Sequence, residues 1–160
     1  MKLARLAPLV VVALVGCTPS PTTAAEVGDA TVSVSTLDAL LEDCPTIGQQ
    51  EVTAPLAMNE LIRMAAFRQV ADTTGTELNE DELRSLLLAD ATYGPFLAEQ
   101  PGCVDLLIPG LAAATLPEKG DVEELNEALQ ELEITVNPRY GTWQEDAFAI
   151  AGSGSLSTEA

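Results

Sequence analysis

The stretch TAPLAMNELIRMAAFRQVADTT, residues 53–74, decides the fold, because it is the most apolar part of the chain after the first sixteen residues. Thr53 can cap a helix, Pro55 suits a first helical turn, and Gly75 stands where a left-handed cap ends a helix. These signals predict a long central helix around which the rest of the chain is arranged.

The polar side chains of this helix do not keep to one face. Asn59, Glu60 and Arg63 share a face at about 100° per residue, but apolar residues occupy the same face a turn or two later. The second half of the helix is therefore apolar nearly all round, which indicates burial by other helices. The alternative is a groove that accepts apolar segments of another protein. The candidate client-binding residues are Met64, Phe67, Val70, Tyr93 and Phe96.

Outward from this helix, caps and apolar spacing predict four shorter helices. Their ranges are 35–44, 79–91, 103–116 and 121–132. Ser35, Asn79 and Asp121 are the expected N-caps of the first, second and fourth of these helices. We expect Pro109-Gly110 to kink or break the third of these, since proline cannot donate a helical hydrogen bond. A Gly28-Asp29 turn among β-branched residues predicts an early strand or hairpin, and alternation at Ile134 and Val136 predicts a late strand.

The N-terminus has the pattern of a secretory signal. Lys2 and Arg5 precede an apolar run of about ten residues, which is too short for the roughly 20 residues of a membrane-spanning helix. The following Leu-Val-Gly-Cys, which ends at Cys17, resembles the lipobox of bacterial lipoproteins. This resemblance implies cleavage after residue 16 and two acyl chains on Cys17, enough for stable anchoring. The alternative is an ordinary secreted protein. Residues 17–25 are expected to be a tether.

Charge and composition exclude several classes of function. The chain has 160 residues with a formal net charge of -18 and no histidine. This acidity disfavours nucleic acid, which needs clustered Lys and Arg. Without histidine, the commonest hydrolase dyads and His-ligated metal sites are missing. A carboxylate glycosidase is a weak alternative, since so many acids always offer some pair. We therefore expect no enzyme activity, no cofactor and no metal site.

The three cysteines fall into two groups. Cys17 is the candidate lipidation site, which leaves Cys44 and Cys103 for an oxidising compartment. A bridge between them would close a loop of 59 residues and stabilise the fold by up to about 4 kcal/mol. Two buried free thiols are the alternative.

The layout as a whole resembles the SurA N-terminal-like domain of exported bacterial chaperones and foldases. The early strand around Val27-Gly28-Asp29, the helices that follow, and a late strand before Asn137-Pro138-Arg139-Tyr140-Gly141 carry this resemblance. It implies a mainly α fold, in which a small two-stranded sheet pairs the N- and C-terminal strands. The domain would cover residues 26–146, and residues 147–160 are expected to be a disordered tail.

The chain also departs from that family. Its foldases carry a prolyl isomerase domain with histidines in the active site, and this chain has neither the length nor a single histidine. The resemblance therefore implies an ATP-independent chaperone, or holdase, for secreted proteins, without isomerase activity. It would be lipid-anchored on the extracytoplasmic face of the cell membrane, with unfolded or secreted proteins as clients. The alternative is a non-catalytic envelope lipoprotein that binds one specific protein partner.

Overall fold

The computed structural model describes residues 20–152. Within this range the chain forms six α-helices with short strands at both ends, which confirms a mainly α fold with a small sheet. The helices are α1 Val34–Asp43, α2 Ala54–Thr74, α3 Glu80–Ala89, α4 Gly94–Glu99, α5 Val104–Lys119 and α6 Val122–Glu131. The strands are β1 Thr23–Val27, β2 Ala30–Ser33, β3 Thr46–Ile47, β4 Gln50–Glu51, β5 Ile134–Val136, β6 Thr142–Gln144 and β7 Ala149–Ala151. Two 3-10 turns complete the fold, η1 Pro101–Cys103 and η2 Pro138–Tyr140.

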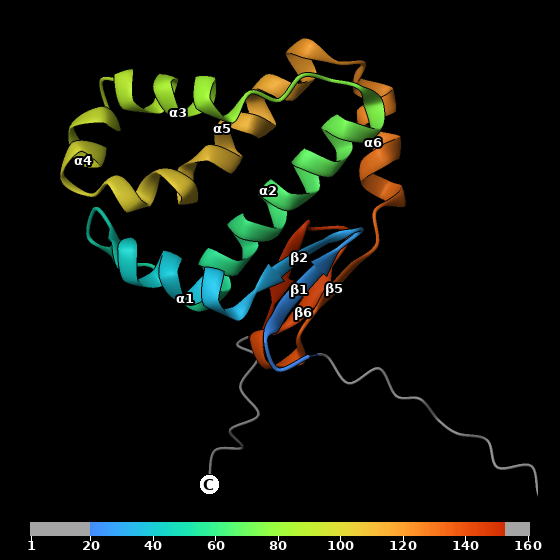
Figure 1. Ribbon diagram of the computed structural model, residues 1–160, viewed down its shortest axis with the longest axis horizontal. Helices are drawn as coiled ribbons and strands as arrows, with labels where there is room; N and C mark the ends of the chain where they lie inside the picture. Colours follow the sequence, from blue (N-terminus) through green and yellow to red (C-terminus); the bar gives the residue numbers. More distant parts are fainter. Residues whose placement is uncertain (1–19, 153–160) are drawn as a thin grey trace, which may run out of the picture.

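Helix α2 is the centre of the molecule, as the sequence predicted. Figure 1 shows it (green) crossing between the sheet on one side and α3 with α5 on the other. Thr53 is its N-cap, and Gly75 ends it with a φ of 67° and a backbone N–H that donates to the carbonyl of Ala71. Because α5, α6, α1 and the sheet all pack on α2, most of its circumference is buried.

The main sheet has three antiparallel strands in the order β2-β1-β5. The predicted pairing of N- and C-terminal strands is present between β1 and β5, but the prediction of only two strands is wrong. The reason is the turn Gly28-Asp29, which folds β2 back onto β1 and pairs Val27 with Ala30. Gly28 has a φ of 50°, as the first central position of a type II′ turn requires.

Both predicted boundaries of the domain need correction. Strand β1 begins at Thr23, inside the expected tether, because Ala24 and Ala25 are buried and pair with the neighbouring strands. At the other end, β6 and β7 form a hairpin that reaches Ala151, inside the expected tail. Phe148 anchors this hairpin by stacking on Phe67 of α2 at 6.3 Å between ring centroids.

Two of the predicted N-caps of the shorter helices are confirmed, and the third lies two residues earlier than predicted. Asn79 accepts from the N–H of Glu82, and Asp121 accepts from the first N–H groups of α6. For α1 the cap is Ser33 rather than Ser35. Helix α5 continues through Pro109, so the expected break at Pro109-Gly110 is wrong. The carbonyl that loses its partner belongs to Asp105, in the exposed first turn, where water can satisfy it.

The signal peptide at residues 1–16, the lipidation site Cys17, residues 18–19 and residues 153–160 lie outside the described part of the chain. Among residues 20–152, no helix combines the length and apolar character needed to cross a bilayer. The same residues contain no cluster of three or more His, Cys, Asp or Glu side chains with metal-binding geometry.

Candidate functional site

The five predicted client-binding residues do not form one surface. Met64, Phe67 and Val70 of α2 are buried, as the apolar pattern of the helix indicated, and the alternative of an exposed groove at these three residues is not what the structure shows. The sheet, α5 and α6 surround that part of the helix, which explains its apolar character on every side. Tyr93, the N-cap of α4, is 45% exposed, and Phe96 in α4 is partly buried.

Phe67 and Val70 do line a small apolar cavity of about 160 Å³ between α2, α5 and α6. Leu116, Leu125 and Leu129 form other walls of it. Cavities of about 150 Å³ hold a molecule the size of benzene. This cavity therefore has room for one side chain, not for a segment of another protein.

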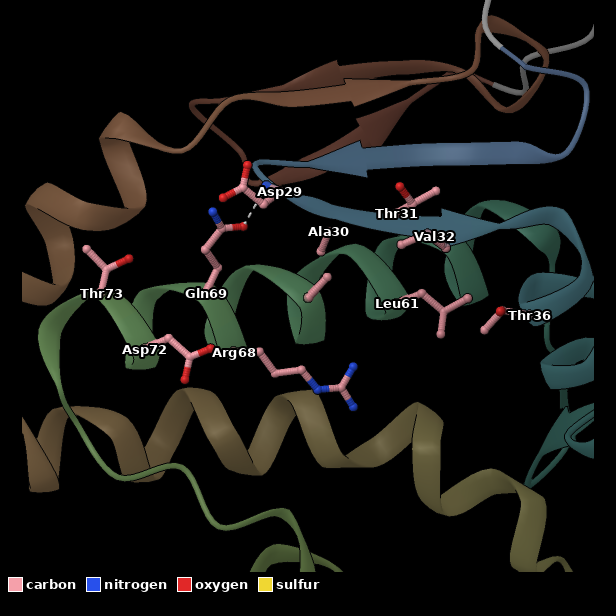
Figure 2. Close-up of a pocket in the computed structure, with 11 residues that line it drawn as sticks. Asp29, Ala30, Thr31, Val32, Thr36, Leu61, Arg68, Gln69, Asp72 and Thr73 are labelled. Atoms are coloured by element: carbon pink, nitrogen blue, oxygen red, sulfur yellow. Dashed lines mark hydrogen bonds between the residues drawn. The ribbon is translucent and has the colours of Figure 1, made fainter.

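A larger hollow lies on another face of α2 and was not predicted. It has a volume of about 730 Å³ and is lined by α2, by β2 and by the turn that precedes β2. Figure 2 shows β2 running alongside α2, with Val32 and Ala30 above and Leu61 and Arg68 on the helix. We call this hollow the α2 groove. Its lining residues are Asp29, Ala30, Thr31, Val32, Thr36, Leu61, Ala65, Arg68, Gln69, Asp72 and Thr73.

The α2 groove continues toward α1 and the start of α5. A second hollow of about 350 Å³ shares Thr36 and Leu61 with it and extends to Asp43 and Asp105. Together, the two adjacent hollows form an open channel. Helix α2 contributes both apolar and polar side chains to it, namely Leu61, Ala65, Arg68, Gln69, Asp72 and Thr73. Such a shape suits an extended chain better than a compact small molecule, which calls for an enclosed pocket.

Arg68 is the single basic residue among those that line the α2 groove. Its guanidinium donates to both carboxylate oxygens of Glu80, from Nε at 2.6 Å and from Nη2 at 2.7 Å. These hydrogen bonds lower the pKa of Glu80 and raise the pKa of Arg68. The positive charge is thus already neutralised, whereas Asp29 and Asp72 make no salt bridge within the described residues.

Gln69 fixes the tip of the hairpin to α2. Its Oε1 accepts from the backbone N–H of Asp29 at 3.2 Å, a bond drawn in Figure 2. The side-chain amide of Gln69 lies so close to Gly28 that a Cβ atom there would overlap with it. The hairpin therefore has a defined position over the helix, which sets the width of the groove.

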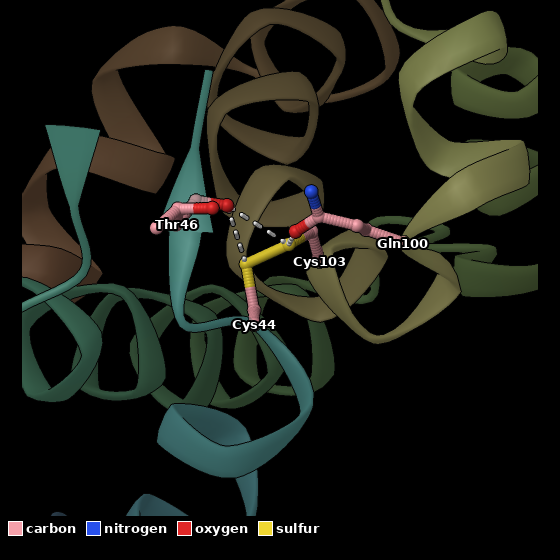
Figure 3. Close-up of a disulfide and its surroundings, with 4 residues drawn as sticks. All are labelled: Cys44, Thr46, Gln100 and Cys103. Atoms are coloured by element: carbon pink, nitrogen blue, oxygen red, sulfur yellow. Dashed lines mark hydrogen bonds between the residues drawn. A yellow bond between two sulfur atoms is a disulfide. The ribbon is translucent and has the colours of Figure 1, made fainter. Parts of the chain in front are cut away.

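Cys44 and Cys103 form the predicted disulfide, with 4.8 Å between their Cα atoms. It connects the end of α1 to the start of α5, and both cysteines are fully buried (Figure 3). The carbonyl oxygen of Thr46 lies 3.8 Å and 3.6 Å from the two sulfurs. Since disulfide sulfurs carry no proton, this is packing rather than hydrogen bonding. The bridge lies next to Asp43 and Gly102, at the far end of the channel.

Comparison of the chain with models of protein families, with curated proteins and with solved structures finds no match. The resemblance to SurA N-terminal-like domains therefore stays a prediction.

Proposed function

We propose that the protein is a non-catalytic, lipid-anchored extracytoplasmic chaperone that holds extended segments of secreted proteins. The observation that carries this proposal is the open channel along α2 beside the hairpin of β1 and β2. Its walls offer both apolar side chains and polar groups, so it suits polypeptides of varied sequence. The lipobox-like residues before Cys17 support the anchor, and the absence of histidine from the sequence supports a role without isomerase chemistry.

The test is suppression of aggregation by the chain from residue 18 onward. Alkylated, unfolded lysozyme serves as a basic secreted client and alkylated α-lactalbumin as an acidic one, each diluted out of urea and followed by light scattering. We expect reduced scattering at a few-fold molar excess, more strongly for the basic client because the chaperone is acidic. Unchanged scattering of both clients at tenfold excess would exclude general chaperone activity.

A single specific partner is the second candidate, and one observation favours it. Large apolar side chains with high exposure are few in residues 20–152, namely Leu86, Leu88, Tyr93 and Val122. A general holdase normally offers a larger apolar surface. Crosslinking in membranes followed by purification separates the two candidates, because one stoichiometric partner supports this one and a spread of secreted proteins supports the chaperone.

The anchor has its own test. Replacement of Cys17→Ser should leave the precursor unprocessed and move the protein out of the membrane fraction after cell lysis. Processing and membrane association equal to those of the wild type would contradict lipidation at this residue.

A further inference from the structure

Strand β2 is an open edge of the main sheet. Its neighbour β1 lies in the middle, and the other side of β2 has no strand within the described residues. The N–H of Gly28 donates to the carbonyl of Glu133, so Gly28 and Glu133 form a hydrogen-bonded pair of β1 and β5. In an antiparallel ladder such pairs alternate with pairs that do not exchange hydrogen bonds.

This alternation determines which way the backbone of Thr31 points. Two residues before Gly28, Glu26 directs its N–H and C=O toward Thr135 of β5. Thr31, which lies opposite Glu26 on the other side, therefore receives no bond from β1. Its N–H and C=O therefore point outward from the edge of the sheet, and neither takes part in a backbone bond to a turn, loop or cap among residues 20–152. Thr31 also lines the α2 groove.

The α2 groove has the size of one added strand. An extended strand takes about 160 Å³ per residue, from a rise of about 3.3 Å, a spacing of about 4.8 Å and a thickness of about 10 Å. The volume of about 730 Å³ therefore corresponds to about four to five residues, and β2 itself has four. A strand in that place would rest alternate side chains on Leu61 and Ala65 of α2.

The charge of the α2 groove indicates which charge an added strand would need. Asp29 and Asp72 make no salt bridge in the described structure, and Arg68 is neutralised by Glu80. Of the five basic side chains in residues 20–152, four are bound to carboxylates, against 24 acidic side chains in the same range. A basic segment is therefore attracted to the groove and an acidic one repelled.

We propose that the α2 groove binds a basic, extended peptide segment by strand addition to the free edge of β2, with small apolar side chains on α2 and Lys or Arg side chains near Asp29 and Asp72. The inference rests on the proposed function, because it names how a client is held. Strand addition takes its affinity from main-chain hydrogen bonds and its specificity from alternate side chains. Two other occupants have the wrong charge: residues 153–160 contain Glu159 and no basic residue, and a second copy is equally acidic.

The test uses a fluorescein-labelled nonapeptide of alternating Val and Lys, titrated with the chain from residue 18 onward and followed by anisotropy. Thr31→Pro removes the free N–H at an edge position, where proline is tolerated, and Thr31→Ala is the matched control. Asp29→Asn with Asp72→Asn removes the charge, with Glu127→Gln plus Glu131→Gln on α6 as its control. Thermal melts verify that each variant is folded. A peptide with N-methylated alternate amides tests the same bonds on the wild-type protein.

We expect about tenfold weaker binding with Thr31→Pro and with the N-methylated peptide, and wild-type binding with Thr31→Ala. The Asp variant should bind more weakly and with less dependence on salt, whereas its control should not change. A peptide with Glu in place of Lys should not bind, and the Lys peptide should protect the Thr31 amide from hydrogen exchange. Equal binding by Thr31→Pro and Thr31→Ala, or equal binding of the Glu peptide, would overturn the inference.

Three further results would also overturn the inference. A tenfold gain in peptide affinity on deletion of residues 153–160 would mean that these residues occupy the edge of β2. A dimer that dissociates in the Thr31→Pro variant would mean that a second copy of the chain pairs with the edge of β2. Suppression of aggregation by Thr31→Pro as strong as that of Thr31→Ala would leave the chaperone proposal standing without strand addition. Conversely, peptide binding at β2 without suppression of aggregation would reject the chaperone proposal alone.

Discussion

At the scale of single residues, the contact that matters most for the α2 groove is the one between the backbone of Gly28 and the side chain of Gln69. Gly28 needs its positive φ for the turn, and the side chain of Gln69 leaves no room for a Cβ atom. We expect Gly28→Ala to lose more than the about 1–2 kcal/mol that a left-handed backbone costs a residue with a Cβ, because Gln69 must also move. Denaturant unfolding measures the loss.

Gly48 provides the matched control for that substitution. It has a similar φ of 60° but open space around the position of a Cβ atom. Gly48→Ala should therefore show the backbone cost alone. Equal losses of unfolding free energy in the two variants would mean that Gln69 does not hold the hairpin in place.

The ion pair of Arg68 and Glu80 predicts a pH dependence of stability. Hydrogen bonds from Arg68 lower the folded-state pKa of Glu80 below its ordinary value of 4.5, so the carboxylate stabilises the folded state above that pH. The contribution is lost as the pH falls through the folded-state pKa. Since both side chains are partly exposed, we expect Glu80→Gln to cost no more than about 1 kcal/mol at pH 7.

This difference between wild type and Glu80→Gln should shrink when the pH falls below 4.5. Urea titrations at pH 7 and at successively lower pH values test it, with Glu127→Gln at an exposed position of α6 as the control. A difference that is the same at every pH would show that the lost stability comes from something other than the charge of Glu80.

At the scale of elements, the disulfide joins α1 to the start of α5 across a separation of 59 residues. We expect Cys44→Ala with Cys103→Ala to lose about 2–5 kcal/mol of unfolding free energy, because the unfolded chain regains the freedom that the bridge removes. Reduced wild-type protein is the comparison, since it keeps both side chains. A loss of less than about 1 kcal/mol would mean that the packing of α1, α2 and α5 suffices by itself.

The sequence predicted the elements whose signals are local. Thr53 and Gly75 marked both ends of α2, and Asn79 and Asp121 marked two further helix starts. The hairpin of β6 and β7 was missed because its strands have three residues each and owe their place to contacts with α2, such as Phe148 on Phe67. A strand of three residues is too short to show the alternation of apolar and polar residues by which strands are recognised in a sequence.

The groove lay beyond sequence reasoning for a related reason. The apolar pattern of α2 shows that the helix is surrounded, but it does not show which neighbour covers which residue. Phe67 and Val70 face α5 and α6, whereas Leu61 and Ala65 face the hollow beside β2. That difference depends on long-range contacts, such as the hydrogen bond from Asp29 to Gln69 across 40 residues of sequence.

At the scale of the whole molecule, acidic side chains far outnumber basic ones. Because four of the five basic side chains in residues 20–152 are already bound in ion pairs, the remaining carboxylates repel one another. We expect the melting temperature to rise when NaCl increases from about 10 mM to about 150 mM, as the Debye length falls from about 30 Å to about 8 Å. Calorimetry at several salt concentrations measures this. A melting temperature that falls with NaCl would mean that the four ion pairs outweigh the repulsion.

The place of β1 in the sheet has a consequence for the order in which the protein assembles. Ribosomes make the N-terminus first, so β1 and β2 can form their hairpin early, while the other side of β1 stays open. That side is filled only by β5 and by Asn137, whose Nδ2 donates to the carbonyl of Thr23 across 114 residues. Contacts of such long range are slow to form. A growing chain therefore completes the main sheet only after all six described α-helices have been made.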